Sequence, residues 1–366
     1  MTMRKIASHY ALINGALERG IVVEVDDHGT ITNITRHDTI DNLASVEFYP
    51  GILIPGMVNA HCHLELSYLR GAIAEGGGYA TFASEIGRVR GGFSDEERLR
   101  KASIADATMW EQGIEAVADI ANDDLVMPIK ERSRIQYKTM FEFFGLNNHN
   151  TETLEELASK YRNASVTPHS TYSVQDREFK AICSKYRELL SLHFLESENE
   201  ALLYQHKGSL HDWYQRMGWA CDFLEYGSPA MRAGESIPLE SNLLLVHNTC
   251  ATATDVKSIE LRLKGCVTWV LCPESNRYIS NLCPPVGMLD EMGVSIALGT
   301  DSLASARTLS MVDNMRLLGD VPLEKLLTYA TINGAKALGI DATKGSIAVG
   351  KCPGLVIIEG VDFTSM

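Results

Sequence analysis

Short apolar runs recur along the chain, and each one leads into polar or ionisable residues. The first is "ILIPGMVNA", residues 52–60, which leads directly into His61 and His63. Runs of this length, broken by Gly and Pro, predict short buried strands rather than helices. Residues at or near the ends of the eight runs are His61 and His63, then Asp119, Glu142, His169, His193 with Glu196, His247, Cys272 and Asp301.

The longer segments between these runs carry helix signals. "SDEERLRKASIADATMWEQ" has an acidic start after Ser94, and "PLEKLLTYATINGAKALG" ends at Gly339. Strands that alternate with helices imply parallel pairing, and eight such units predict an α/β fold of the (β/α)8 TIM-barrel type over residues 56–339. An open doubly wound sheet ranks second, because no Gly-x-Gly-x-x-Gly follows an early strand.

The two ends of the chain do not follow this rhythm. Residues 1–55 include "GIVVEVDDHGTITNI", two β-rich runs around an Asp-His-Gly turn, and residues 340–366 include the strand-like "GSIAVGKCPGLVIIEGVDF". We expect both ends to meet in one small β-sandwich domain. The alternative is that each end separately decorates the rim of the barrel.

Composition narrows the class of protein and its surroundings. The chain has 366 residues, 45% of them hydrophobic, and a formal net charge of −14, which disfavours nucleic acid and anionic membrane as partners. The eight cysteines form no Cys-x-x-Cys pair, which favours a reducing compartment. No run approaches the apolar length of a membrane helix, so we expect a cytoplasmic protein and, by default, a homodimer.

His61 and His63 are the first candidates for chemistry. In a strand, residues two apart share one face, so both imidazoles point the same way while Cys62 points the other way. Two imidazoles at a strand end can hold one metal ion. A single His-x-His is a weak signal, because ordinary core or surface histidines produce it too.

Five motifs in order give the chain a family resemblance. "GMVNAHCHLE", "HFLESE", "VHNT", "CPESN" and "GTDSLAS" resemble the amidohydrolase superfamily, within its cytosine, triazine and adenosine-type deaminase branch. "HCHLELS" together with "HFLESE" is most similar to the aminodeoxyfutalosine deaminases. The resemblance covers residues from about 50 to 360.

The resemblance implies a metal site built from His61, His63, His193 and Asp301. Zinc or iron(II) with such ligands lowers the pKa of bound water to about 7, which gives hydroxide at neutral pH. Some two-metal relatives use a carboxylated lysine at the end of the fourth strand, where this chain has His169. We therefore expect one divalent transition metal per chain, with zinc preferred to iron(II).

The same resemblance implies three catalytic roles. Glu196 resembles the residue that protonates a ring nitrogen of the substrate and makes the neighbouring carbon electrophilic. His247 resembles the residue that orients and polarises the attacking hydroxide. Asp301 would bind metal and also accept the proton of the attacking water. Without the motif, Glu196 would read as part of a solvated acidic run.

Substrate contacts are less specified. His169 resembles a residue that contacts the base or ribose, and Glu65 would either contact substrate or orient His63. The Gly-rich segment at residues 68–88 is a candidate lid, in which Arg70 and Arg88 would face a carboxylate on the substrate. Relatives usually carry Asn after "GTDSLAS", whereas this chain has Ala306 and then Arg307.

The sequence therefore predicts a metal-dependent aminohydrolase that deaminates an adenine-like nucleoside, with aminodeoxyfutalosine as the best guess. Rivals in the same class are the deamination of adenosine, methylthioadenosine or S-adenosylhomocysteine, and the hydrolysis of a guanine-like or triazine-like cyclic amidine. A non-catalytic metal-binding barrel is a rival from another class, but metal storage alone needs neither Glu196 nor His247.

Overall fold

The computed structural model describes residues 3–40, 43–263 and 265–360. Residues 1–2, 41–42 and 361–366, which belong to the predicted β-domain, lie outside the described residues, as does residue 264 of the predicted barrel. No helix within the described ranges is both long and apolar enough to cross a membrane.

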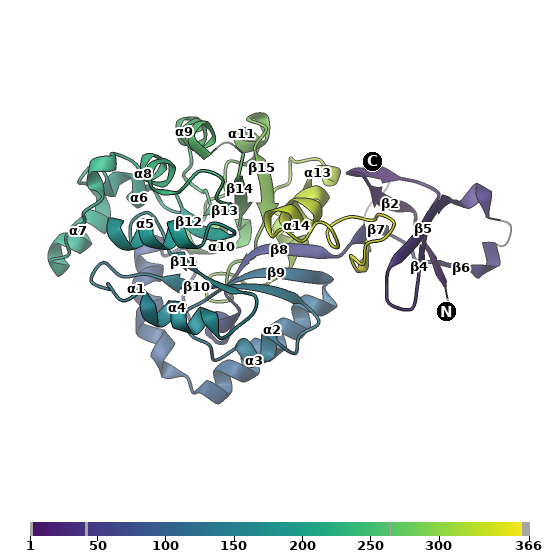
Figure 1. Ribbon diagram of the computed structural model, residues 1–366, viewed down its shortest axis with the longest axis horizontal. Helices are drawn as coiled ribbons and strands as arrows, with labels where there is room; N and C mark the ends of the chain where they lie inside the picture. Colours follow the sequence, from purple (N-terminus) through teal and green to yellow (C-terminus); the bar gives the residue numbers. More distant parts are fainter. Residues whose placement is uncertain (1–2, 41–42, 264, 361–366) are drawn as a thin grey trace.

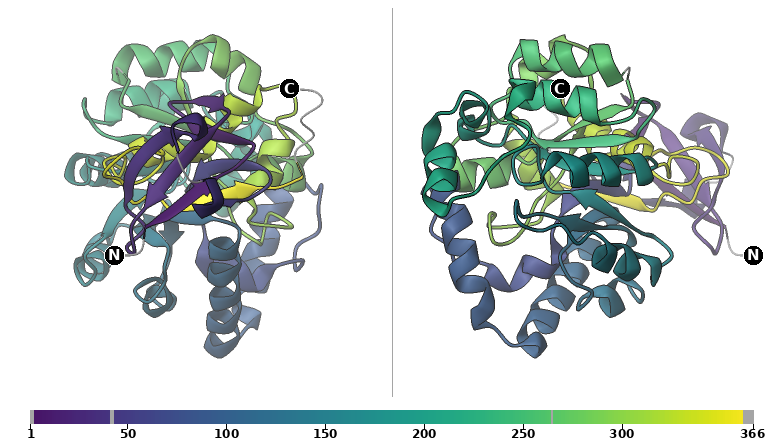
Figure 2. Two further views of the ribbon diagram at one scale, coloured as in Figure 1. Left: turned by 90° about the vertical axis from the view of Figure 1, so that its right-hand side faces the viewer. Right: turned by 60° about the vertical axis from the view of Figure 1, so that its left-hand side comes forward.

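Eight parallel strands form the centre of the molecule, and they follow one another around it in chain order (Figures 1 and 2). They form two four-stranded sheets, which meet at both seams through single parallel bridges, Ser170 with His193 and Cys62 with Asp301. The predicted barrel is therefore confirmed. Its strands are β8 (Met57–Cys62), β9 (Ile114–Ala121), β10 (Gln136–Phe143), β11 (Ala164–Pro168), β12 (Leu190–Phe194), β13 (Leu243–His247), β14 (Val267–Leu271) and β15 (Ser295–Leu298).

These strands read as continuous apolar runs because both of their faces are buried. One face fills the barrel interior with small side chains, among them Ala60, Ala116 and Ala297. The other face packs against the outer helices, as Leu245 and Val166 do. A strand buried on both sides shows no alternation of apolar and polar positions.

Helices follow the strands and form the outer layer (Figure 2). Ser94 caps α2, because its Oγ accepts a hydrogen bond from the backbone N–H of Glu97 at 3.3 Å. The last helical region ends before Gly339, which has a φ of +64°. The outer helices are α2 (Asp95–Glu111), α3 (Met127–Lys130), α4 (Glu152–Ser159), α5 (Asp176–Lys185), α8 (Pro229–Ser236), α9 (Ala253–Leu263), α11 (Val286–Glu291), α13 (Leu323–Thr328), the π-helix η6 (Tyr329–Asn333) and α14 (Gly334–Ala337).

Further short elements follow the carboxyl ends of the strands. Strand β8 is followed by the 3-10 helix η3 (Leu64–Leu69), then α1 (Tyr79–Val89) and the 3-10 helix η4 (Arg90–Gly92). Strand β12 is followed by α6 (Glu198–Leu203), α7 (Gly208–Met217) and η5 (Leu224–Tyr226). Strand β14 is followed by α10 (Pro273–Ser280), and β15 by α12 (Met311–Arg316). Helix α1 lies in the predicted lid and contains no buried residue. Phe82, Ile86 and Val89 of α1 are partly buried against an apolar cluster that includes Leu66 and Leu69, and movement of the lid stays a prediction.

The seven N-terminal strands and the C-terminal strand β16 form two further four-stranded sheets beside the barrel (Figure 1). One has the order β5-β4-β1-β6 and the other β16-β7-β2-β3, and they share one apolar cluster that includes Val23, Ile31 and Leu53. The strands are β1 (Arg4–Ala7), β2 (Tyr10–Ile13), β3 (Ala16–Glu18), β4 (Ile21–Val25), β5 (Ile31–Arg36), β6 (Val46–Phe48), β7 (Ile52–Pro55) and β16 (Leu355–Ile358), with 3-10 turns η1 (His37–Thr39) and η2 (Leu43–Ser45).

Strand β16 pairs antiparallel with β7, so segments from the two ends of the chain lie in one sheet (Figure 2, left). The Asp-His-Gly turn joins β4 and β5, where Asp26 Oδ1 accepts the backbone N–H groups of His28 and Thr30, each at 2.9 Å. The division of the chain at residues 55 and 340 stays our proposal for its domains.

Candidate active site

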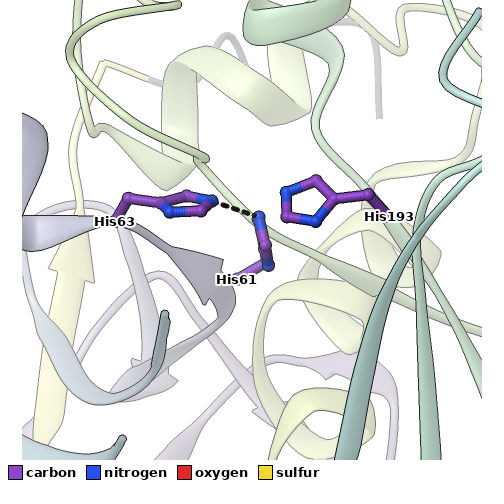
Figure 3. Close-up of side chains that lie close together, drawn as sticks. All are labelled: His61, His63 and His193. Atoms are coloured by element: carbon purple, nitrogen blue, oxygen red, sulfur yellow. Dashed lines mark hydrogen bonds between the residues drawn. The ribbon is translucent and has the colours of Figure 1, made fainter. Parts of the chain in front are cut away.

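The four residues expected to bind metal lie together at the carboxyl end of the barrel. His61 and His63 leave the end of β8, and their Nε2 atoms are 3.2 Å apart (Figure 3). Asp301 Oδ1 lies 3.4 Å from His63 Nε2 and 3.7 Å from His61 Nε2. His193, from β12, completes the group, because its ligand atom and those of His61 and His63 all lie within 4.8 Å of one another.

This donor set fits a divalent transition metal. Burial lowers the pKa of His63 to about 3 and the pKa of His193 well below its ordinary value, so both imidazoles are neutral. Metals bind neutral imidazole nitrogens, and three such nitrogens with one carboxylate form an established zinc ligand set. Ring nitrogens that face one another at 3.2 Å need a cation or a shared proton between them.

Asp301 is held in place by two hydroxyl groups. Ser275 Oγ and Ser305 Oγ donate to Asp301 Oδ2 at 2.5 and 2.6 Å, which leaves Oδ1 to face the histidines. Ser275 belongs to "CPESN" and Ser305 to "GTDSLAS", so both motifs supply support for a ligand. Both serines lie within motifs that indicate the family, but neither was predicted to have a role.

Glu196 and His247 face one another beside the cluster. Glu196 Oε1 lies 3.8 Å from His247 Nε2. Burial, reinforced by the negative charge of Asp301, raises the pKa of Glu196 well above its ordinary value. Glu196 is therefore a carboxylic acid that can donate a proton.

Asn276 fixes the role of His247. Its Nδ2 lies 3.1 Å from His247 Nδ1 and donates to it, so the proton of the neutral ring is on Nε2. Burial lowers the pKa of His247 to about 3, which keeps the ring neutral. His247 thus presents a hydrogen-bond donor on the side of Glu196.

The backbone is strained where these side chains leave their strands. Leu195, His247, Asn248 and Asp301 have φ values of +47°, +77°, +57° and +56°. Side chains other than glycine rarely adopt this region, and it persists where the surroundings impose it. Here the backbone N–H of Asn248 donates to Phe194 O at 3.0 Å, and that of Asp301 donates to His61 O at 3.1 Å.

His169 follows β11 and stacks on His193, with ring centroids 4.5 Å apart and planes 19° apart. Glu142, at the end of β10, has Oε1 3.4 Å from His193 Nδ1. Burial raises the pKa of Glu142 to about 8, so it is mostly protonated at neutral pH. Glu142 was predicted only to end an apolar run, although a carboxylate between the aromatic residues of "FEFF" is a signal that could have identified it.

A cavity of about 240 Å³ opens over the cluster. Its walls combine the polar groups described above with apolar side chains from α1, including Phe82 and Ile86. Arg90 directly follows α1 and lines this cavity. Its Nη2 donates to Asn122 Oδ1 at 3.3 Å.

Three expected substrate contacts lie elsewhere. Arg70 lines a separate cavity beside Lys101, and Arg88 is 67% exposed and pairs with Glu85, with Nη2 to Oε2 at 2.6 Å. Glu65 Oε2 accepts the backbone N–H of Asn122 at 2.8 Å, so it holds the loop after β9. Arg70 follows η3 and Arg88 lies in the last turn of α1, and neither lines the active-site cavity, which corrects the expected carboxylate contacts.

The loop that departs from the relatives contacts the lid segment. Ala306 is 1% exposed, and Arg307 forms a two-pronged ion pair with Glu75, in which Nε lies 2.8 Å from Oε1. Arg307 therefore ties the loop after β15 to the segment between β8 and α1.

Comparison with known proteins identifies the family. The model of the amidohydrolase family matches residues 52–365. An adenosine deaminase of Helicobacter pylori is 28% identical over 87% of this chain and 81% of its own length. A 5-methylthioadenosine/S-adenosylhomocysteine deaminase of Halobacterium salinarum is 28% identical over 84% of this chain and 73% of its own length.

Solved structures agree with this assignment. The crystal structure of Helicobacter pylori aminofutalosine deaminase in complex with methylthio-coformycin has a TM-score of 0.83 and 25% identity, and covers 98% of this chain and 93% of that one. A triazine hydrolase from Arthobacter aurescens shares the fold, with a TM-score of 0.78 at 15% identity and coverages of 99% and 88%. The resemblance expected from the five motifs is confirmed. The chain belongs to the amidohydrolase family and is a hydrolase that acts on carbon–nitrogen bonds in cyclic amidines.

Proposed function

We propose that the enzyme deaminates an adenine-like nucleoside, and that aminodeoxyfutalosine is its preferred substrate. The observation that supports this proposal most directly is the pair of Glu196 and His247 beside the histidine and aspartate cluster, with Glu196 Oε1 3.8 Å from His247 Nε2. A metal-binding module would need the cluster alone. Similarity to deaminases that are named for adenosine, methylthioadenosine and aminofutalosine supports the adenine base.

His61, His63, His193 and Asp301 would hold one divalent metal, with zinc preferred and iron(II) accepted by the same ligands. A similar adenosine deaminase structure from Xanthomonas campestris was solved with bound zinc. When bound, such a metal lowers the pKa of a coordinated water to about 7. Burial alone would raise the pKa of Asp301, but a hydrogen bond with His61 and the nearby His63 and His247 hold that pKa well below its ordinary value. Asp301 is therefore ionised, and its carboxylate can accept a proton at the cluster.

Glu196 would supply the proton that activates the base. As a buried acid it can protonate the ring nitrogen next to the carbon that bears the exocyclic amine, which makes that carbon electrophilic. His247 would stabilise the negative charge that develops on oxygen at that carbon, by donating from Nε2. Water replaces the amine, so the products are the oxo-nucleoside and ammonia.

The rest of the cavity would bind the sugar and its 5′ substituent. His169 stands beside the cluster and can contact the ribose, while Phe82, Ile86 and Phe144 offer an apolar surface. Arg90 would pair with a carboxylate on the substituent, in place of Arg70 and Arg88. The apolar surface also suits a methylthio group, so methylthioadenosine is the second candidate.

Ammonia release from a panel of nucleosides tests the function. We expect the highest kcat/KM with aminodeoxyfutalosine, followed by methylthioadenosine and adenosine. Activity confined to free bases such as guanine, or to triazines, would contradict the nucleoside assignment. Stoichiometric metal without any ammonia release would support the non-catalytic barrel.

A pair of arginine variants tests the carboxylate contact. Arg90→Ala should raise KM for the carboxylated nucleoside by roughly tenfold, and change KM for methylthioadenosine much less, because only the former loses a charge-assisted hydrogen bond. Arg88→Ala is the matched control, since Arg88 is exposed and lies outside the cavity. Equal effects of both variants would remove Arg90 from the site.

A further inference from the structure

We propose that the barrel has a second ligand site, at the end opposite the active site, which binds a phosphate-type oxyanion. The site is a cavity of about 500 Å³, here named the basal cavity, at the starts of β10, β11 and β12. Its charged lining residues are Lys138, Arg162, Lys185, Arg187 and Glu188. This inference does not depend on the proposed deaminase function.

The position of Lys138 in β10 places the basal cavity. Side chains alternate along a strand, so Lys138, Met140 and Glu142 share one face. Met140 packs in the barrel interior and Glu142 lines the active-site cavity, so Lys138 occupies the opposite end of the same face. Four residues of strand separate Lys138 from Glu142 by roughly 13 Å.

The basal cavity has more positive than negative charge, in a chain whose formal net charge is −14. Four cationic side chains line it with one carboxylate, Glu188. Two of the cations have local roles: Lys185 Nζ lies 2.6 Å from Glu155 Oε2, and Arg187 Nε donates to Ser184 O at 3.1 Å near the end of α5.

The other two cations have no such role. Within the described ranges, neither Lys138, which is half-buried, nor Arg162 has a hydrogen bond or ion pair through its side chain. Lys130 shows the contrast: it is buried near the same strand, pairs with Asp119 and donates to Thr139 Oγ1 at 3.2 Å. A half-buried ammonium group is stabilised by an anion, and in the basal cavity the protein supplies too few.

The chemistry of the lining favours phosphate. Lysine offers a compact charge and arginine a planar fork of donors, the combination that binds phosphate groups. A phosphate monoester carries a charge of about −1.5 to −2 at neutral pH, which suits a surplus of several cations better than a single carboxylate does. The volume exceeds that of one phosphate, so the ligand is either inorganic phosphate or the phosphate group of a larger phosphomonoester.

Calorimetric titration of the full-length protein at constant ionic strength tests the site, with inorganic phosphate, uridine 5′-monophosphate and uridine as probes. We expect saturable binding of phosphate or of the nucleotide and none of uridine. Tighter binding of the nucleotide would identify a phosphomonoester as the ligand, and equal or weaker binding would identify free phosphate. Absence of binding at millimolar phosphate and nucleotide, or uridine binding as well as its nucleotide, would overturn the proposal.

Charge variants locate the binding. Lys138→Met and Arg162→Ala should each weaken binding by about tenfold or more, since each removes a charge-assisted contact. Lys257→Met, on the exposed side of α9, removes the same charge elsewhere and should leave binding unchanged. An equal loss in all three would show general electrostatic attraction and refute the site. Arg162 is exposed, so its variant reports on binding even if Lys138→Met fails to fold.

Discussion

The carboxyl end of the barrel and the paired β-sheets beside it both have a buried interior, but they bury different groups. In the sheets the interior is apolar, as at Val23, Ile31 and Leu53, and the buried Ser8 hydroxyl shares its one proton with two backbone carbonyl oxygens at 2.7 Å. At the barrel end the buried groups are ionisable, and Glu142 Oε1 and His61 Nδ1 have no hydrogen-bond partner among the described atoms. Buried polar atoms without partners are rare in folded proteins, and in the sheets Thr35 Oγ1 is one of them. Those at the barrel end differ because they lie among the residues expected to bind metal.

The backbone shows the same contrast. In the sheets, the positive φ of Asn14 and Gly15 lies in the turn between β2 and β3, where Asn-Gly adopts it at little cost. At the barrel end it lies on Leu195, His247 and Asp301, whose side chains disfavour it. One region is built for stability, and the other stores strain to aim side chains into one cavity.

Removal of a metal ligand should break this contrast most completely. In His61→Ala we expect metal content and ammonia release to fall together to background, because the remaining ligands no longer surround the ion. Elemental analysis and the ammonia assay measure both quantities. His28→Ala, an exposed histidine of the sheets, is the control and should keep both. Full activity in His61→Ala would refute the ligand assignment.

Glu196→Gln should separate binding of metal from chemistry. Glutamine keeps the size of the side chain but cannot deliver a proton, so kcat should fall by roughly 10²-fold or more while metal content is retained. Glu198→Gln, in the same acidic run but exposed, should have near-normal kcat. A near-normal kcat in Glu196→Gln would show that Glu196 does not deliver the proton.

The pH dependence of stability sharpens the contrast at Glu200, which is buried behind the site. Burial raises its pKa to about 8. The folded state holds this proton more tightly than the unfolded state does. The contribution of Glu200 to the free energy of unfolding is therefore fully present below the unfolded pKa near 4.5 and is lost as pH rises through the folded pKa of about 8.

Glu200→Gln should therefore reduce the loss of stability that occurs as pH rises from about 4.5 to 8. Over this window the wild-type free energy of unfolding should fall by up to about 1.4 kcal/mol per pH unit from Glu200 alone, and the variant should lack that contribution. Thermal unfolding at pH 5, 7 and 9 measures it. Parallel curves for both proteins would show that Glu200 does not titrate with folding.

The smallest effect is expected in the sheets. Ile31→Val removes one buried methylene and should lower the free energy of unfolding by about 1 kcal/mol, with kcat/KM unchanged below the melting transition. Denaturant unfolding and steady-state kinetics check the two halves. A clear loss of kcat/KM would show that the sheets do more than stabilise the chain.

The sequence alone determined the strands of the barrel and the residues of the cluster that we propose binds metal. Strands buried on both faces appear as apolar runs, and parallel strands bring their carboxyl ends to one side, so His61, His193 and Asp301 had to converge. The five motifs identified the family for the same reason: they are local strings at those strand ends. The strands and motifs depend on residues that are near in sequence, and the convergence of their ends follows from parallel pairing.

Tertiary structure alone decided which groups support the cluster and line the cavity. Ser275 reaches Asp301, and Asn276 reaches His247, only because neighbouring barrel strands place their loops together. Arg90 lines the cavity and Arg88 does not, because the two side chains leave the end of α1 at different positions, while Arg70 follows η3 and lines a separate cavity. Such contacts depend on how distant segments pack, and residue spacing fixes directions only within one helix or strand.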